Sequence, residues 1–147
     1  MPEKLTRHEI REAALMLLYQ IELASGGTED LSGIAADCVE AFGFAFNSTV
    51  VKLVEGILNN KAAIDEVIQK YSPTRKIERI PKINLCITRI AVYEMDFMPD
   101  IPDKVAVNEA IELSKEYAYK PDSQFISGLL GAHYKEKTGS KGLEDEQ

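Results

Sequence analysis

The sequence contains no tryptophan and only two cysteines and two histidines among its 147 residues. Cys38 and Cys86 stand far apart without a Cys-x-x-Cys pair, which argues against a disulfide scaffold and indicates reduced thiols in a cytoplasmic protein. His8 and His133 do not belong to a Glu-x-x-His pattern, so no set of histidines and carboxylates with metal-ligand spacing is visible. We therefore expect neither a metal nor a cofactor.

Long hydrophobic runs are also missing. The densest one, residues 13–21, is bounded by Glu12 and Glu22 and is far shorter than the roughly 20 apolar residues that a transmembrane helix needs. It also lacks the basic start and the small-residue cleavage site of a signal peptide. We expect a protein that neither spans a membrane nor binds one.

Catalytic motifs are absent as well. The sequence has no phosphate-binding glycine motif, no His-Glu-x-x-His zinc motif and no nucleophile elbow. The glycines of SGLLG at 127–131 are not followed by the lysine of a P-loop, and neither cysteine has an obvious base beside it. We expect that the protein is not an enzyme.

The sequence is rich in helical periodicity. Thr6 followed three residues later by Glu9 forms a capping box, which predicts a helix from there to about Ala24. Further helices are predicted over 29–42, over 48–71 as one continuous helix, from Pro81 to just before Pro99, from about Asp103, and from Pro121-Asp122, with a short turn of helix at 74–79.

These helices place apolar side chains on one face. The residues expected to point inward on the last three helices include Ile83, Ile87, Ile90, Ala91, Phe97, Val107, Ala110, Ile111, Ser114, Phe125, Ile126, Leu129 and Leu130. No alternating run of five or more residues marks a strand. We predict an all-α bundle over residues 1–137, with helical halves of about 1–72 and 73–137, and a disordered acidic tail over 138–147.

The carboxylates of VAVNEAIELSKEY, residues 105–117, raise the question of a metal or catalytic site. Glu109, Glu112 and Glu116 fall mostly outside the apolar stripe of this helix. Such spacing favours a solvated helix face. We interpret them as surface carboxylates.

Charge is distributed unevenly along the chain. The net charge is −7, yet the segment from Lys70 to Arg89 holds six basic side chains and one acidic one. Such asymmetry can steer an anionic partner to one face. Alternatively, these basic groups lie around a helix junction and point in several directions. The sequence does not separate the two readings.

Two groups of residues combine cations with an aromatic ring, an arrangement that can hold phosphates and stack an unpaired base. On the first helix, His8, Arg11 and Tyr19 lie near one face at 100° per residue. Further along, Tyr71 stands between Lys70 and Arg75. The alternative is that both tyrosines simply pack at the edge of the core.

Four stretches occur in an order that resembles the NusB family of bacterial transcription antitermination factors. They are REAALMLLYQIEL, IERIPKINLCITRIAVYEM, VAVNEAIELSKEY and FISGLL, and they cover about Thr6 to His133. The resemblance implies a seven-helix, all-α fold in two subdomains. It also implies binding to boxA RNA of ribosomal RNA leaders together with NusE, a small-subunit ribosomal protein, within an RNA polymerase antitermination complex.

The resemblance also implies site residues, which join those suggested by charge and spacing. The candidate RNA-binding residues are Lys4, Arg7, His8, Arg11, Tyr19, Lys70, Tyr71, Arg75, Lys120 and Gln124. A second group either ties helices together or borders a protein-partner face: Arg89, Tyr93, Glu94, Asn108 and Glu109.

The chain departs from the family pattern at two places that concern RNA. Its arginine-rich start is reduced to Arg7 and Arg11 with Glu9 between them, and Gln124 stands where the family has a basic residue. The basic Lys70–Arg89 segment could compensate. The alternative function is a protein-interaction module that has kept the fold and lost most of its affinity for RNA.

Overall fold

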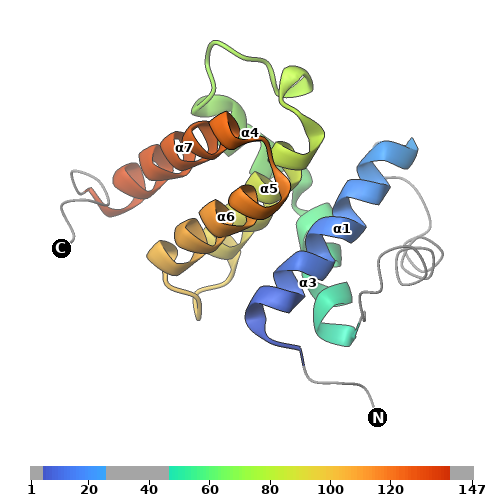
Figure 1. Cartoon of the computed structure of the whole chain (residues 1–147). Helices are drawn as coiled ribbons and strands as arrows, with labels where there is room; N and C mark the ends of the chain where they lie inside the picture. Colours follow the sequence, from blue (N-terminus) through green and yellow to red (C-terminus); the bar gives the residue numbers. More distant parts are fainter. Residues whose placement is uncertain (1–4, 26–46, 140–147) are drawn as a thin grey trace. The chain divides into compact units, whose positions relative to one another are not determined.

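The structure, a computed structural model, describes residues 5–25 and 47–139 (Figure 1). These ranges contain six α-helices and one 3-10 helix and no strand, which confirms the all-α class. The elements are α1 (Arg7–Ser25), α3 (Ser48–Asn59), α4 (Lys61–Lys70), η1 (Ile77–Arg79), α5 (Lys82–Phe97), α6 (Asp103–Tyr117) and α7 (Lys120–Thr138). The helix predicted over 29–42 and the tail after Gly139 lie outside the described residues.

The first helix begins at the predicted capping box. The backbone N–H of Thr6 donates to Glu9 Oε1 at 2.8 Å, and the backbone N–H of Glu9 donates to Thr6 Oγ1 at 3.0 Å. These two bonds satisfy amides that the first turn of a helix leaves without intrahelical partners. The local sequence therefore sets the start of α1.

The prediction of one continuous helix over 48–71 is wrong, because the chain leaves the helical conformation at Asn60. This residue has φ −114° and ψ 18°, and α4 starts after it. Asparagine side chains compete for backbone hydrogen bonds and weaken helix interiors, and two stand in succession here. The break was hidden because Val54, Ile57, Ile64 and Ile68, all buried, keep one hydrophobic phase across it.

The chain forms two compact units that divide between Asn59 and Asn60. The sequence predicts two helical halves of one domain that meet near Ser72-Pro73. In the structure that stretch is a loop within the second unit. There, Gln69 of α4 donates to the Ser72 carbonyl at 2.8 Å and accepts from the Ile77 amide at 2.9 Å. The change in composition thus marks a loop and not a unit boundary.

In the first unit, α1 packs against α3. Their buried apolar side chains include Leu15, Leu17 and Ile21 on α1 and Val50, Val54 and Ile57 on α3.

None of the helices in the described ranges combines the length and apolar character needed to cross a membrane.

In the second unit, α5 packs against α4, α6 and α7 (Figure 1). Its central position explains why nearly all of its residues from Asn84 to Met95 are buried. Phe97, predicted to point inward, is 42% exposed. It is the last residue of α5, and its ring stacks on that of Tyr93 with centroids 5.4 Å apart.

The inward face of α6 was predicted well. Val107, Ala110 and Ser114 are buried and Ile111, also predicted inward, is half-buried. Glu112 and Glu116 are exposed. Glu112 pairs with Lys115 at 3.4 Å on the helix surface. The interpretation of these two carboxylates as surface groups is confirmed.

Candidate nucleic-acid interface

The end of α4 brings a cation, an aromatic ring and a carboxylate together. Lys70 is the last residue of the helix and Tyr71 is its C-cap. Lys70 Nζ lies 5.4 Å from the centroid of the Tyr71 ring and 2.8 Å from Glu136 Oε2 of α7. The Tyr71 hydroxyl donates to Glu136 Oε1. Lys70 and Tyr71, which were both predicted to bind RNA, thus donate to the same side chain, that of Glu136.

The protonation equilibria reflect this contact. Hydrogen bonds from Lys70 and then Tyr71 lower the pKa of Glu136. The hydrogen bond to Glu136 raises the pKa of Lys70, and partial burial together with the same carboxylate raises the pKa of Tyr71. At neutral pH the three groups are therefore an ammonium, a neutral phenol and a carboxylate.

A polar network holds α7 in place behind Tyr71. The His133 ring lies 5.6 Å from the Tyr71 ring, and His133 Nε2 lies 2.9 Å from Asp96 Oδ1 on α5. Lys137 Nζ lies 3.2 Å from Asp96 Oδ1 and 3.0 Å from Asp103 Oδ2 on α6. The segment of α7 that carries Glu136 is therefore anchored to two other helices.

A second pairing of a cation with an aromatic ring lies in the loop after α4. Arg75 Cζ is 5.0 Å from the centroid of the Phe125 ring on α7. The Arg75 carbonyl accepts from Gln69 Nε2 at 3.1 Å and from the Ser72 hydroxyl at 2.9 Å. These bonds fix the backbone from which the exposed guanidinium extends. Arginine over an aromatic face is a favourable contact that also leaves its N–H groups available to a phosphate.

Arg75 also lines an open hollow of about 630 Å³. The other residues that line it are Thr74, Lys76, Arg79, Pro81 and Asp122. Three cations face one carboxylate there, so the hollow is basic. A basic hollow beside an aromatic ring suits a phosphate group that belongs to a nucleotide.

The remaining predicted residues of the second unit lie at the start of α7. Lys120 is its first residue and is exposed, and Gln124 is exposed one residue before Phe125. The helix predicted from Pro121-Asp122 begins one residue earlier, at Lys120. Proline is tolerated there because the first-turn amides need no helical acceptor.

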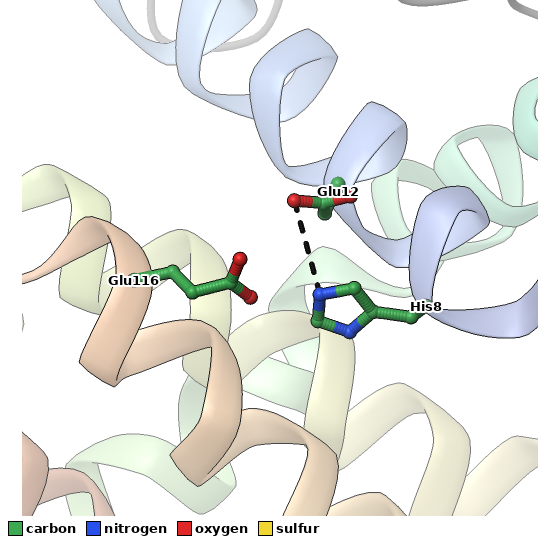
Figure 2. Close-up of side chains that lie close together, drawn as sticks. All are labelled: His8, Glu12 and Glu116. Atoms are coloured by element: carbon green, nitrogen blue, oxygen red, sulfur yellow. Dashed lines mark ion pairs between the residues drawn. The ribbon is translucent and has the colours of Figure 1, made fainter.

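The predicted residues of the first unit differ in their exposure. Arg7 is exposed at the start of α1, and Tyr19 is half-buried. His8 is half-buried, and its Nε2 lies 3.8 Å from Glu12 Oε2. Figure 2 marks this ion pair with a dashed line. Arg11, expected on the RNA face, is only 4% exposed. Lys4 lies outside the described residues.

The burial of Arg11 has a local cause. Four residues further along α1, one turn away, Leu15 is fully buried, and Ala14 and Leu18 beside it are buried as well. Arg11 therefore stands on the buried side of the helix, and it does not contribute an exposed cation beside Tyr19.

Arg89 ties two helices of the second unit together. Its Nε lies 2.8 Å from Asp65 Oδ1 and its Nη2 lies 2.9 Å from Asp65 Oδ2. The Arg89 side chain is 6% exposed and that of Asp65 is 24% exposed, so this partly buried bidentate pair joins α5 to α4. Glu94 is likewise buried, at 3% exposure.

The other partner-face candidates lie nearer the surface. Tyr93 and Glu109 are half-buried and Asn108 is exposed. Tyr93 stacks on the exposed Phe97. These residues are on helices of the second unit and include the aromatic surface that a protein partner could use.

Sequence reasoning missed Glu136, Phe125 as the partner of Arg75, and Asp122 in the basic hollow. The contacts of Glu136 with Lys70 and Tyr71 span 66 and 65 residues. Local periodicity carries no signal for such distant pairs. Phe125 was instead predicted as a core residue, and it is half-buried.

Comparisons with known proteins identify the family of the chain. The sequence model of the NusB family matches residues 8–135. The transcription antitermination protein NusB of Acetivibrio thermocellus is 37% identical over 133 residues, which is 89% of this chain and 90% of that protein. The protein of that name from Leptospira biflexa is 38% identical, over 90% of this chain and 94% of its own.

Solved structures show the same fold. T. maritima NusB has a TM-score of 0.74 at 28% identity and covers 87% of this chain and 89% of its own. The crystal structure of the antitermination factors NusB and NusE in complex with dsRNA gives a TM-score of 0.75 at 24% identity, covering 88% of this chain and 96% of the matched one. The family match over most of the sequence and the shared helical fold lead to one conclusion: this chain belongs to the NusB family.

Proposed function

We propose that this chain is a transcription antitermination factor that binds boxA-type, single-stranded RNA of ribosomal RNA leaders together with NusE. The observation that carries the proposal is the surface formed by Lys70, Tyr71 and Arg75 with the Phe125 ring and the basic hollow beside it. Relatives carry the name transcription antitermination protein, and a similar structure contains NusB with NusE and RNA.

The surface has the two components that single-stranded RNA requires. Arg75, Lys76 and Arg79 supply charge for the phosphates, and the Tyr71 ring supplies a face on which a base can stack. Lys120 and Gln124 extend the polar surface at the start of α7, next in sequence to Phe125. Binding of this kind involves no catalytic step.

NusE supplies what the chain itself lacks. The protein carries a net charge of −7, and its first helix has Arg7 exposed but Arg11 buried. RNA affinity of the chain alone is therefore weak. A basic partner bound beside the RNA adds phosphate contacts without any change in this chain. The complex acts in the cytoplasm on RNA polymerase that is transcribing ribosomal RNA.

The test is the affinity for a boxA-like RNA with and without NusE at two salt concentrations. We expect weak binding by the chain alone and tighter binding with NusE, each reduced by salt. Tight binding that NusE leaves unchanged would contradict the cooperative mode. A scrambled RNA of equal length serves as the control for sequence preference.

The second candidate function is a protein-interaction module with little affinity for RNA. Three observations favour it: Arg11 is buried, Gln124 is uncharged, and Lys70 is paired with Glu136. In that case the chain would bind NusE with unchanged affinity whether or not RNA is present. Absence of RNA binding under all four conditions, with NusE binding retained, would favour this candidate.

A further inference from the structure

Glu136 lies where an RNA phosphate would have to bind in order to use Lys70 and Tyr71. Its two carboxylate oxygens accept from Lys70 Nζ at 2.8 Å and from the Tyr71 hydroxyl. A phosphodiester also presents two anionic oxygens that accept from the same kinds of donor. Lys70 and Tyr71 thus have their preferred acceptor already, within the same chain.

The pair is at the surface, where it can be exchanged. The side chains of Lys70 and Glu136 are 57% and 56% exposed. Exposed ion pairs contribute little to stability, because water competes for both charges. Releasing Glu136 therefore requires no unfolding, and an incoming anion can take its place.

The backbone under Glu136 does not move with its side chain. His133, one turn earlier on α7, contacts Asp96 and the Tyr71 ring, and Lys137, the next residue, contacts Asp96 and Asp103. Only the carboxylate side chain has to swing away. The ring of Tyr71 meanwhile stays against His133 and keeps its position for a base.

We propose that Glu136 is an internal competitor of RNA: its carboxylate occupies Lys70 and the Tyr71 hydroxyl in the free protein, and an RNA phosphate has to displace it. This inference rests on the proposed RNA-binding function and adds a specificity-determining residue to it. A polyanion without bases gains nothing from the Tyr71 ring to offset the displaced pair, so the competition favours ligands that stack as well as bind phosphate.

The experiment compares Glu136→Gln with a matched control, Glu112→Gln. Glu112 is a carboxylate of the same unit, 59% exposed and paired with Lys115 at 3.4 Å. Both variants remove one negative charge from the surface, so a general change in the attraction of RNA affects both. Neither side chain is buried, and circular dichroism is expected to show unchanged helix content.

The readout is the affinity for boxA-like RNA in the presence of NusE. We expect Glu136→Gln to bind about two- to five-fold more tightly than the unaltered protein, the range that exposed ion pairs span. Glu112→Gln is expected to change affinity by less than half as much. In a Lys70→Gln, Tyr71→Phe background, Glu136→Gln is expected to have no effect, since its contacts are gone.

The outcomes separate this inference from the function on which it rests. Equal effects of Glu136→Gln and Glu112→Gln, with RNA still bound, would overturn the competition and leave the proposed function standing. If Glu136→Gln still raises the affinity for RNA in the Lys70→Gln, Tyr71→Phe background, the proposed competition is overturned as well. Absence of RNA binding by every variant with NusE would overturn both.

Discussion

Single residues of this protein show how weakly side-chain chemistry alone predicts exposure. Arg11 and Arg75 are both arginines in segments that the sequence assigned to RNA, yet Arg11 is 4% exposed and Arg75 is exposed. The position of each arginine on its helix or loop determines how exposed its side chain is. Arg75 extends from a loop that Gln69 holds, whereas Arg11 stands above Leu15 on the buried side of α1.

Arg75 is expected to contribute one phosphate contact. Arg75→Gln should weaken binding to RNA, and it should reduce the slope of log affinity against log salt by about 0.7, the value for one contact with a single strand. Lys115→Gln, which removes one exposed cation from α6, serves as the control and should leave the slope unchanged. An unchanged slope for Arg75→Gln would place Arg75 outside the RNA-binding surface.

Asp96 is expected to stabilise the fold in its ionised form. Burial raises its pKa, but hydrogen bonds from His133 and Lys137 outweigh burial and lower the pKa below the ordinary value. A carboxylate with a lowered pKa contributes stability above the unfolded pKa of about 3.9 and loses it as the pH falls through the folded value.

Asp96→Asn should therefore lower the free energy of unfolding at pH 7 by about 1.5–3 kcal/mol, the range for a hydrogen bond to a charged group. The difference in the free energy of unfolding between Asp96→Asn and the unaltered protein should become smaller below about pH 4. Urea unfolding at pH 7 and pH 3, followed by circular dichroism, measures both. Asp100→Asn, at an exposed turn, is the control, and a constant difference across pH would contradict the assignment.

At the scale of elements, local signals predicted where most helices begin and end. The capping box of Thr6 and Glu9, Pro81 before α5 and Pro99 after it all act within a few residues. The break at Asn60 escaped prediction because the buried positions on its two sides share one helical phase. Hydrophobic periodicity reports which face is buried and not whether the backbone is continuous.

At the candidate site, the sequence predicted residues that are close together in the chain and missed those that are distant in it. Lys70, Tyr71 and Arg75 could be selected from the sequence because they are close in the chain. Glu136 and Phe125 could not, since these residues of α7 reach Lys70, Tyr71 and Arg75 only in the folded chain. Contacts between distant segments depend on the tertiary packing, which a single sequence does not display.

The capping box offers a prediction for α1. Thr6→Ala should lower the free energy of unfolding by about 1 kcal/mol, because it removes the acceptor of the Glu9 amide. Thr49→Ala, at an exposed position in the first turn of α3, should have a smaller effect. Thermal unfolding of both variants tests this, and equal melting temperatures would show that the cap contributes little.

At the scale of the whole molecule, the acidic net charge and the basic hollow act in opposite directions. The chain carries −7 in total, while Arg75, Lys76 and Arg79 gather around one hollow of the second unit. A local basic surface on an acidic protein binds anions selectively, because the remaining surface repels them.

The salt dependence of RNA binding should reflect this balance. Three cations in the hollow predict a slope of about −2 for the chain alone, at about −0.7 for each phosphate contacted. With NusE bound the slope should become steeper, since a basic partner adds contacts. Fluorescence anisotropy of a labelled RNA across a salt series measures both values. A steep slope for the chain alone that NusE leaves unchanged would contradict the proposal that NusE supplies part of the phosphate contacts.

The amide of Gln69 has a consequence for how this surface can evolve or be redesigned. It bonds to the carbonyls of Ser72 and Arg75 and to the N–H of Ile77, so a side chain of α4 fixes the path of the loop. Pro73, Thr74 and Lys76 are exposed and take no part in those bonds. Substitutions at these positions therefore leave the Gln69 bonds in place, and those at Thr74 and Lys76, which line the hollow, can change ligand preference while the loop keeps its path.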